Sequence, residues 1–212
     1  SFKRKMEGID FVFSQSPELA SIGSKAQYLQ YLSTIFPNSK VKDIVYHGTE
    51  NGEFKKFYNN LRSGIHFGTL KQAEGRRKAT DFEFKNNAKF IQAIINLKNP
   101  LKTKDFDWEK AGDAFMMWQP GDDLSDVDFT EYLISSGMIK ESDIQQSEGD
   151  FDLINKKGYD GVIYKNEGAG ETTGENSYAV SKSEQIHILG SKQDIQGFKD
   201  FVSKKINNNK AD

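Results

Sequence analysis

The 212-residue chain contains no cysteine, which excludes disulfide bonds, zinc–thiolate sites and thiol catalysis. It has no apolar run close to the ~20 residues that span a bilayer, so we expect no membrane segment. Neither sign of charge prevails, because 29 basic and 31 acidic residues leave a net charge of −2. Tight binding to nucleic acid requires a basic surface, so we do not expect nucleic acid as a partner.

Histidine is scarce, with only His47, His66 and His187 in the chain. Their spacing matches no metal-binding motif, and without cysteine we expect no metal site. The chain also lacks an initiator methionine and begins at Ser1, which leads us to expect an excised domain. The absence of cysteine suits a reducing compartment, so a cytoplasmic location is expected.

Aromatic residues are abundant, at 12% of the chain, and apolar residues recur from Phe2 to Ile206. A chain of this length can bury a sizeable core as one domain. We therefore expect a single domain over residues 1–206, followed by a disordered tail at 207–212. Its expected parts are an N-terminal helical part at 15–40, a first sheet half at 43–100, an acidic insert at 105–149, a second sheet half at 159–190 and a C-terminal helix at 191–206.

Local patterns predict the elements within these parts. Ser24 and Gln27 form a capping box at the start of an apolar face of helical period, which predicts a helix within 16–36. Further helices are predicted at 70–79, 109–118, 127–136, 150–157 and 191–206. Strands are predicted at 43–47, 64–69, 88–97, 159–166, 176–183 and 184–190. Strict alternation of strand and helix is missing, so we expect an α+β fold with mostly antiparallel sheets.

The segment "VYHGT" places His47 and Gly48 at the end of a predicted strand. One interpretation is that the strand simply stops at a glycine. The other is that a ligand lies flat against the backbone of Gly48 while His47 holds it, since glycine lets a ligand approach the main chain. His66 occupies a similar place in "GIHFGT". His187 alternates with isoleucines, and we expect it to be structural.

Glu175 is the carboxylate that stands out, because it opens an apolar strand directly after the loop "EGAGETTG". Ser177 follows two residues later, so alternation predicts that both side chains share one face. A carboxylate held at the start of a strand can stabilise a positive charge that develops on a substrate. Cleavage of a glycosidic bond requires this, because its transition state resembles an oxocarbenium ion.

The ordered set "VYHGT", "GIHFGT" and "YDGVIY…ENSYAV…EQI" resembles the ADP-ribosyltransferase fold. The closest resemblance is to the domains of this fold in phage and mobile-element polyvalent proteins, and it extends over residues 15–202. It implies two split antiparallel sheets flanked by helices, with the acidic segment as a partly helical insert. It also implies NAD as the substrate, bound in a cleft between the two sheets.

The resemblance assigns NAD-binding roles to the two strand ends. His47 would bond the adenosine-ribose hydroxyl, and Gly48 would offer its backbone to the nicotinamide carboxamide, with Thr49 alongside. His66 stands where the family places a tyrosine that stacks on the nicotinamide. Its neighbours Phe67 and Gly68 complete this part of the predicted NAD site, with Phe67 expected to face the core.

The resemblance also makes Glu175 the catalytic glutamate, bonded to the 2′-hydroxyl of the nicotinamide ribose. In several members the glutamate directly precedes the tyrosine of this strand, where Ser177 stands here. Two interpretations follow: Glu175 is catalytic, or it activates the acceptor and Ser177 replaces the catalytic glutamate. The preceding loop matches the place where the family recognises its acceptor, and Glu167 and Glu171 would favour a basic target such as arginine.

We therefore expect an NAD-dependent mono-ADP-ribosyltransferase of phage type, toxin-like, with NAD hydrolysis as a side activity. Its acceptor is expected to be a macromolecule, a protein of a bacterial host, met in the host cytoplasm or delivered by the phage particle. The alternative is a module of the same fold that binds NAD or a nucleotide without chemistry and docks a partner through 105–149. A nucleic-acid-modifying enzyme is a third reading, disfavoured by the near-neutral charge.

Overall fold

The computed structural model describes residues 2–49, 56–73, 89–108, 128–166 and 174–211. Its helices are α1 (Phe2–Gln15), α2 (Glu18–Ile22), α3 (Lys25–Ser33), α6 (Asp128–Ser135), α7 (Glu141–Ile144), α8 (Asp150–Lys156) and α9 (Lys192–Ala211). Its strands are β1 (Val45–Thr49), β2 (Ile65–Phe67), β3 (Lys89–Ile95), β4 (Pro100–Thr103), β5 (Gly161–Lys165), β6 (Asn176–Val180) and β7 (Ile186–Ile188). A 3₁₀ turn, η2 (Ser183–Gln185), precedes β7.

The strands form two sheets rather than one. The first has the order β1-β3-β7 and is antiparallel, and the second has the order β2-β6-β5-β4. Only the β4–β5 pair within these described strands is parallel. The prediction of an α+β fold with split, mostly antiparallel sheets is confirmed.

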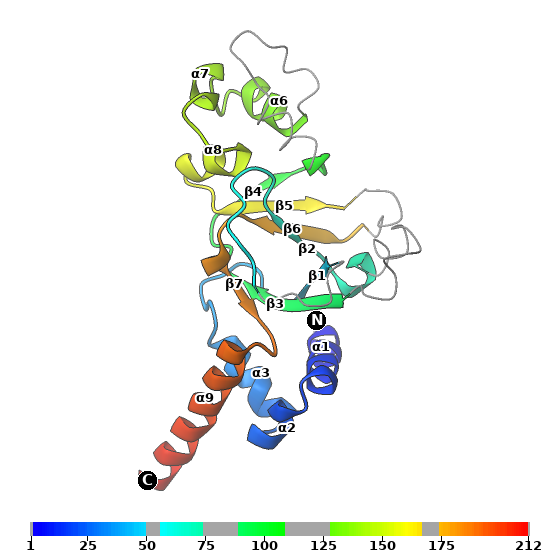
Figure 1. Cartoon of the computed structure of the whole chain (residues 1–212), viewed down its shortest axis with the longest axis vertical. Coiled ribbons are helices and arrows are strands. Elements are labelled where there is room, and N and C mark those ends of the chain that lie inside the picture. Colours follow the sequence, from blue (N-terminus) through cyan, green and yellow to red (C-terminus); the bar gives the residue numbers. More distant parts are fainter. Residues whose placement is uncertain (1, 50–55, 74–88, 109–127, 167–173, 212) are drawn as a thin grey trace.

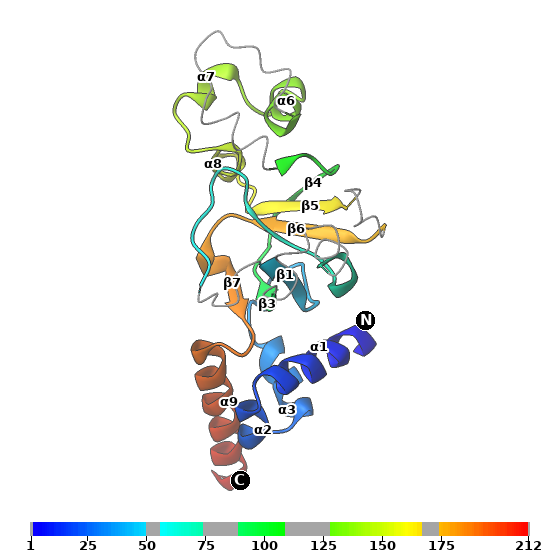
Figure 2. The ribbon, with the colours of Figure 1, turned by 45° about the vertical axis from the view of Figure 1, so that its right-hand side comes forward.

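The two sheets lie in the middle of the molecule, with helices at either end (Figure 1). Helices α1, α2, α3 and α9 gather beyond the first sheet, and α6, α7 and α8 lie beyond the second, as the turned view also shows (Figure 2). Side chains alternate along β1 and the residue before it. Ile44 and Tyr46 face the helices, while Val45 faces the second sheet. The result is a core on each side of each sheet.

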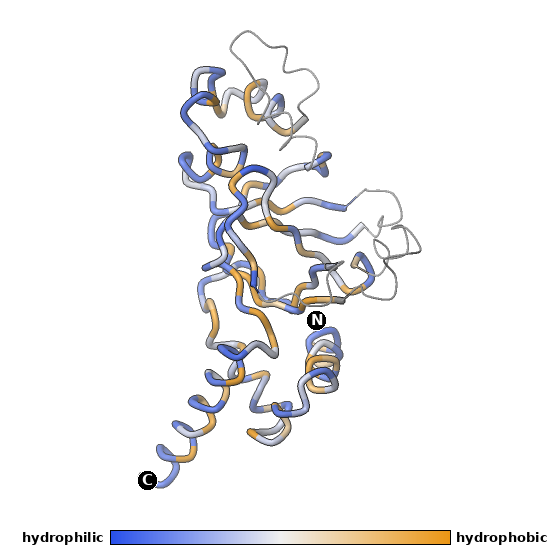
Figure 3. The backbone as a smooth tube through the Cα atoms, in the orientation of Figure 1, coloured by the Kyte–Doolittle hydropathy of each residue, from blue (hydrophilic) through white to orange (hydrophobic). Residues whose placement is uncertain are grey.

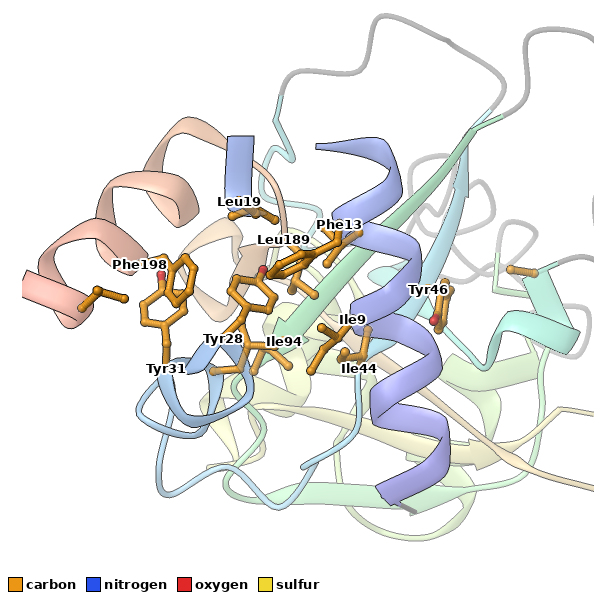
Figure 4. Close-up of a cluster of buried hydrophobic side chains, with 14 residues drawn as sticks. Ile9, Phe13, Leu19, Tyr28, Tyr31, Ile44, Tyr46, Ile94, Leu189 and Phe198 are labelled. Carbon is orange, nitrogen blue, oxygen red and sulfur yellow. The ribbon is translucent and has the colours of Figure 1, made fainter. Parts of the chain in front are cut away.

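The core between the first sheet and its helices contains the tyrosines of α3 (Figure 4). Tyr28 and Tyr31 pack against Phe198 of α9, with ring centroids 5.1 and 5.6 Å apart. The Tyr28 hydroxyl donates to Asp194 at 2.6 Å, and His187 Nε2 lies 2.7 Å from the other oxygen of that carboxylate. His187 thus lies in a buried network that joins β7, α9 and α3.

The described parts of the predicted acidic insert, 105–108 and 128–149, pack onto the second sheet. Phe106 and Trp108 are buried against Phe129 of α6, with ring centroids 5.1 and 4.9 Å apart. The predicted helix at 127–136 corresponds to α6, whereas the one at 109–118 lies outside the described residues. The described part of the insert completes the core on the outer face of the second sheet.

Two helical segments differ from the sequence prediction. Helix α1 was not predicted, although its buried residues Ile9, Val12 and Phe13 have helical spacing. Helix α9 continues through Ala211, so most of the expected disordered tail is helical. Its last buried residue is Val202, and its distal end is hydrophilic (Figure 3). None of the helices in the described residues combines the length and apolarity needed to cross a membrane.

Asp150 of α8 is a fully buried carboxyl group beneath α6. Its Oδ1 accepts a hydrogen bond of 2.5 Å from the Thr130 hydroxyl. Burial raises the pKa of Asp150 from 3.8 to about 7, and the Thr130 hydrogen bond opposes this shift. Between about pH 4 and pH 7, the folded protein therefore holds a proton here that the unfolded chain has already lost.

We predict that the folded protein loses stability as the pH rises through this window. The unfolded state binds fewer protons there, so the slope of the unfolding free energy is negative, and the loss between pH 5 and pH 8 is up to about 3 kcal/mol. Asp150→Asn should remove this part of the slope, whereas Thr130→Val should retain it. Urea titrations of the three proteins at pH 5 and pH 8 measure the difference. An unchanged slope in Asp150→Asn would show that the carboxyl group is ionised in the folded protein.

Candidate active site

The two sheets meet where β1 runs beside the end of β2. Tyr46 and Gly68 exchange two main-chain hydrogen bonds, of 2.8 and 2.9 Å. In an antiparallel pairing of this register, the next bonded pair would be Gly48 with His66. That pair does not form. Instead, the imidazole Nδ1 of His47 lies 2.7 Å from the His66 carbonyl oxygen.

His47 therefore takes the place that the Gly48 N–H would have in a continuous ladder. A carbonyl oxygen only accepts, so Nδ1 of His47 carries the proton and donates it. The ring is supported by two phenylalanines, with centroids 5.1 Å from Phe57 and 5.6 Å from Phe67. These contacts fix the imidazole between the two strands and keep the strands apart.

Gly48 is left with its backbone facing the gap that His47 opens. Main-chain groups two residues apart in a strand point to the same edge, so the N–H and C=O of Gly48 point to the side on which Tyr46 bonds Gly68. Gly48 is exposed, and a Cβ built on it meets no atom within 4 Å. The fold therefore does not require glycine here, and the sheet face at this position is open.

His66 is held by both ring nitrogens. Its Nε2 lies 2.6 Å from the Ser63 carbonyl oxygen, and its Nδ1 lies 2.8 Å from the Tyr164 hydroxyl. Its ring packs against Trp108 at 5.1 Å and faces the core of the outer sheet face. Both ring nitrogens are thus hydrogen-bonded within the protein. A ligand could therefore contact only the face of the His66 ring.

Ser177 lies at the same site, but as a buried group, 2% exposed. Its hydroxyl donates to Oε1 of Gln72 at 2.9 Å, and Gln72 Nε2 donates to the Glu175 carbonyl at 3.1 Å. Gln72 also caps its own helix through Thr69, whose N–H donates to Oε1 at 2.9 Å. Gln72 therefore ties the start of β6 to the end of β2.

Gln72 is a residue that sequence reasoning missed. The signal was present, because Thr69 and Gln72 have the spacing of a capping box. Gly68 belongs to the same arrangement, since a Cβ there would lie 2.2 Å from Gln72 Oε1. Gly68 thus makes room for the Gln72 side chain. This packing role is additional to the cofactor-binding role predicted for Gly68.

Glu175 and Ser177 line two different cavities. A small one, of about 40 Å³, brings together six of the predicted site residues: His47, Gly48, His66, Phe67, Gly68 and Ser177. Glu175 lies one residue before β6 begins and lines a larger cavity of about 680 Å³. The cavities share Tyr46 and Gly68 as walls, so they adjoin each other. Thr49 ends β1 and lines neither cavity. Of the predicted acceptor loop at 167–174, residues 167–173 lie outside the described residues, and Gly174 lines the larger cavity.

The side chain of Glu175 is ion-paired with Arg4 of α1, through its Oε1 and the arginine Nη2. Tyr178 lines the same cavity, and burial together with Asp43 raises the pKa of its hydroxyl, whereas Arg4 lowers it. Arg4 is a second residue that sequence reasoning missed. No local pattern connects it to Glu175, because the two lie 171 positions apart.

The larger cavity has the size of a ligand site, since pockets for small molecules and cofactors range over about 300–1,000 Å³. The smaller cavity alone is too small for a dinucleotide. A ligand the size of a dinucleotide would therefore have to extend into the larger cavity.

The two split sheets with their flanking helices are consistent with the ADP-ribosyltransferase fold that the sequence resembles. Residues 42–198 match the family model described as "ADP-Ribosyltransferase in polyvalent proteins". The match covers more than half of the chain, which therefore belongs to this family. No curated protein and no solved structure matches the chain. The family implies NAD as the substrate.

Two glycine substitutions test the geometry of the site. We predict that Gly48→Val leaves the melting temperature nearly unchanged, because the position is open and in a strand, yet abolishes NAD binding measured by calorimetry. Gly161→Ala is the contrast, since its Cβ would lie 2.3 Å from the Ala179 carbonyl oxygen. It should lower stability by about 1–3 kcal/mol through overpacking. NAD binding to Gly48→Val at wild-type affinity would show that this backbone edge does not face the ligand.

Proposed function

We propose that the protein is an NAD-dependent mono-ADP-ribosyltransferase that transfers ADP-ribose to a macromolecular acceptor, a protein of a bacterial host. The observation that carries this proposal is the edge of Gly48. Strand geometry points its main-chain donor and acceptor toward β2, where the His66 carbonyl pairs with the His47 side chain instead of with Gly48. A carboxamide presents the complementary acceptor and donor, so the nicotinamide is a fitting occupant.

Glu175 supplies the carboxylate of the proposed reaction. As the resemblance implies, the glycosidic bond to nicotinamide stretches first, and positive charge develops on the ribose. A carboxylate that is only 25% exposed stabilises such charge better than one in bulk water. The acceptor then attacks the ribose, and water in place of the acceptor gives NAD hydrolysis as a side activity. Phage origin and a toxin-like role belong to this proposal.

A second candidate function is a binding module without chemistry. Ser177, and not a carboxylate, lies at the cavity of His47 and His66, and its hydroxyl is committed to Gln72. The carboxylate of Glu175 is ion-paired with Arg4 in the neighbouring cavity. This arrangement supports a module that binds NAD and holds it unreacted.

Nicotinamide release from NAD separates the two functions. We predict that wild-type protein releases nicotinamide and that Glu175→Ala lowers the rate ~10²–10³-fold, the usual loss for a group that stabilises the transition state. Ser177→Ala should lower it only about fivefold, which corresponds to one hydrogen bond of ~1 kcal/mol.

Calorimetry with NAD on the same three proteins completes the test. Binding without release in the wild type would support the binding module. Equal release by wild type and Glu175→Ala would contradict the role of this glutamate.

A further inference from the structure

A third cavity, of about 250 Å³, lies outside the candidate active site, and we call it the apolar cavity because seven of its ten lining residues are apolar. Helix α3 and the turn after it form one wall, through Leu29, Leu32, Ile35 and Phe36. The apolar cavity shares two lining residues with the larger cavity, Lys5 and Ile44, and none with the smaller one.

The apolar cavity is built on the hydrophobic core between the first sheet and its helices. Ile44 and Ile94, both labelled in the close-up of this core, are buried and line the cavity (Figure 4). Leu29, Ile35 and Phe36 pack against the same core but are only partly buried. Apolar surface of these three side chains is therefore still exposed, and a ligand that covers it gains free energy from the hydrophobic effect.

Phe36 lines the apolar cavity from an unusual backbone conformation. Its φ is 49°, and no other non-glycine residue in the described ranges has a positive φ. Bulky side chains rarely adopt this left-handed conformation, whereas glycine adopts it without strain. The contacts of the phenylalanine ring, which packs against the core and lines the cavity, therefore outweigh the cost of the turn.

The two charged residues that line the apolar cavity, Lys5 and Lys42, are both cationic. Lys5 is partly buried, yet its ammonium group forms no hydrogen bond or ion pair in the part of the chain that the structure describes. Lys42 donates one hydrogen bond of 2.7 Å to the Pro37 carbonyl, and an ammonium group has three donors. The nearby acidic residues Glu7 and Asp43 line the larger cavity instead. An anionic group in the apolar cavity would thus meet two cations that still have donors to offer.

We propose that the apolar cavity binds a small aliphatic carboxylate, whose hydrocarbon chain lies against the wall of α3 and Phe36 and whose carboxylate pairs with Lys5 and Lys42. The cavity is slightly smaller than the usual range of about 300–1,000 Å³ for ligand pockets. This size excludes a dinucleotide and suits a short chain such as that of octanoate. The proposal is independent of ADP-ribosyl transfer, because the site lies outside the candidate active site.

Calorimetry with a series of carboxylates tests the chemistry of the site. We predict that affinity rises from butanoate to hexanoate to octanoate by about fourfold per methylene group, since a buried methylene contributes ~0.8 kcal/mol. Octylammonium has the same chain as octanoate and the opposite charge, so it should bind at least tenfold more weakly. Equal binding of octanoate and octylammonium would overturn the role of the lysines, and no binding of octanoate at millimolar concentration would overturn the site.

Lys42→Gln tests the pairing with the carboxylate, because Lys42 lines the apolar cavity and neither of the other two. It should weaken octanoate binding about threefold to tenfold, the effect of losing a charge-assisted hydrogen bond near the surface. Lys25→Gln is the matched control, since Lys25 pairs with Asp10 at 2.8 Å and lines none of the three cavities. It should leave the affinity unchanged. Wild-type affinity in Lys42→Gln would contradict this pairing.

Phe36→Gly tests the apolar wall. Glycine suits the positive φ, so the turn should persist, while the loss of the ring should weaken octanoate binding about tenfold. Circular dichroism shows whether the variant is folded. Unchanged affinity in the folded variant would place the hydrocarbon chain elsewhere and overturn the proposal.

Isoleucine methyl signals in nuclear magnetic resonance spectra locate the ligand in the wild-type protein, without any variant. Ile35, Ile44 and Ile94 line the apolar cavity, whereas Ile139 and Ile154 lie in the core on the outer face of the second sheet. Octanoate should shift the first three signals and leave the last two unchanged. Because Ile44 lines the larger cavity as well, a shift of Ile44 without Ile35 and Ile94 would place octanoate there and overturn the proposal.

Discussion

The hydrogen bond from His47 to the His66 carbonyl is the interaction on which the site depends. Without it, the register set by Tyr46 and Gly68 would continue, and Gly48 would pair with His66. The two sheets would then close into a longer ladder, and no main-chain edge would face a ligand. A single imidazole thus ends the pairing of β1 with β2 and leaves Gly48 outside the ladder. Phe57 and Phe67 hold the ring in place for this purpose.

The rest of the fold keeps this opening rigid from both sides. On one side, the buried network of His187, Asp194 and Tyr28 fastens α9 and α3 to the first sheet. On the other, Gln72 fastens the start of β6 to the end of β2 through its amide. Polar groups buried in this way are costly unless each finds a partner, so a network that satisfies them also fixes one geometry. The Gln72 network lines the small cavity itself, whereas the His187 network lies on the helix side of the first sheet.

Much of the fold could be predicted from the sequence, because strand formers, the capping box at Ser24 and the glycine at 158 are local signals. The strand that carries His47 and Gly48 was also predictable from its apolar start, whereas the roles of these two residues stay a prediction. Two features were not. Helix α1 begins with a basic run that conceals the helical spacing of Ile9, Val12 and Phe13. The pairing of Arg4 with Glu175 depends on tertiary packing and leaves no mark in either local sequence.

Glu175 and Ser177 line different cavities, which bears on whether Glu175 is the catalytic glutamate or the residue that activates the acceptor. Strand alternation would have given both side chains one face, but β6 begins only at Asn176, so Glu175 is released from that constraint. Its carboxylate consequently meets a guanidinium in the larger cavity, while Ser177 stays with His47 in the smaller one. In the proposed complex, with the nicotinamide at Gly48, this carboxylate would lie beside the ribose and not beneath the nicotinamide. From that place it could act on the cation of the proposed reaction, while Ser177, committed to Gln72, could not.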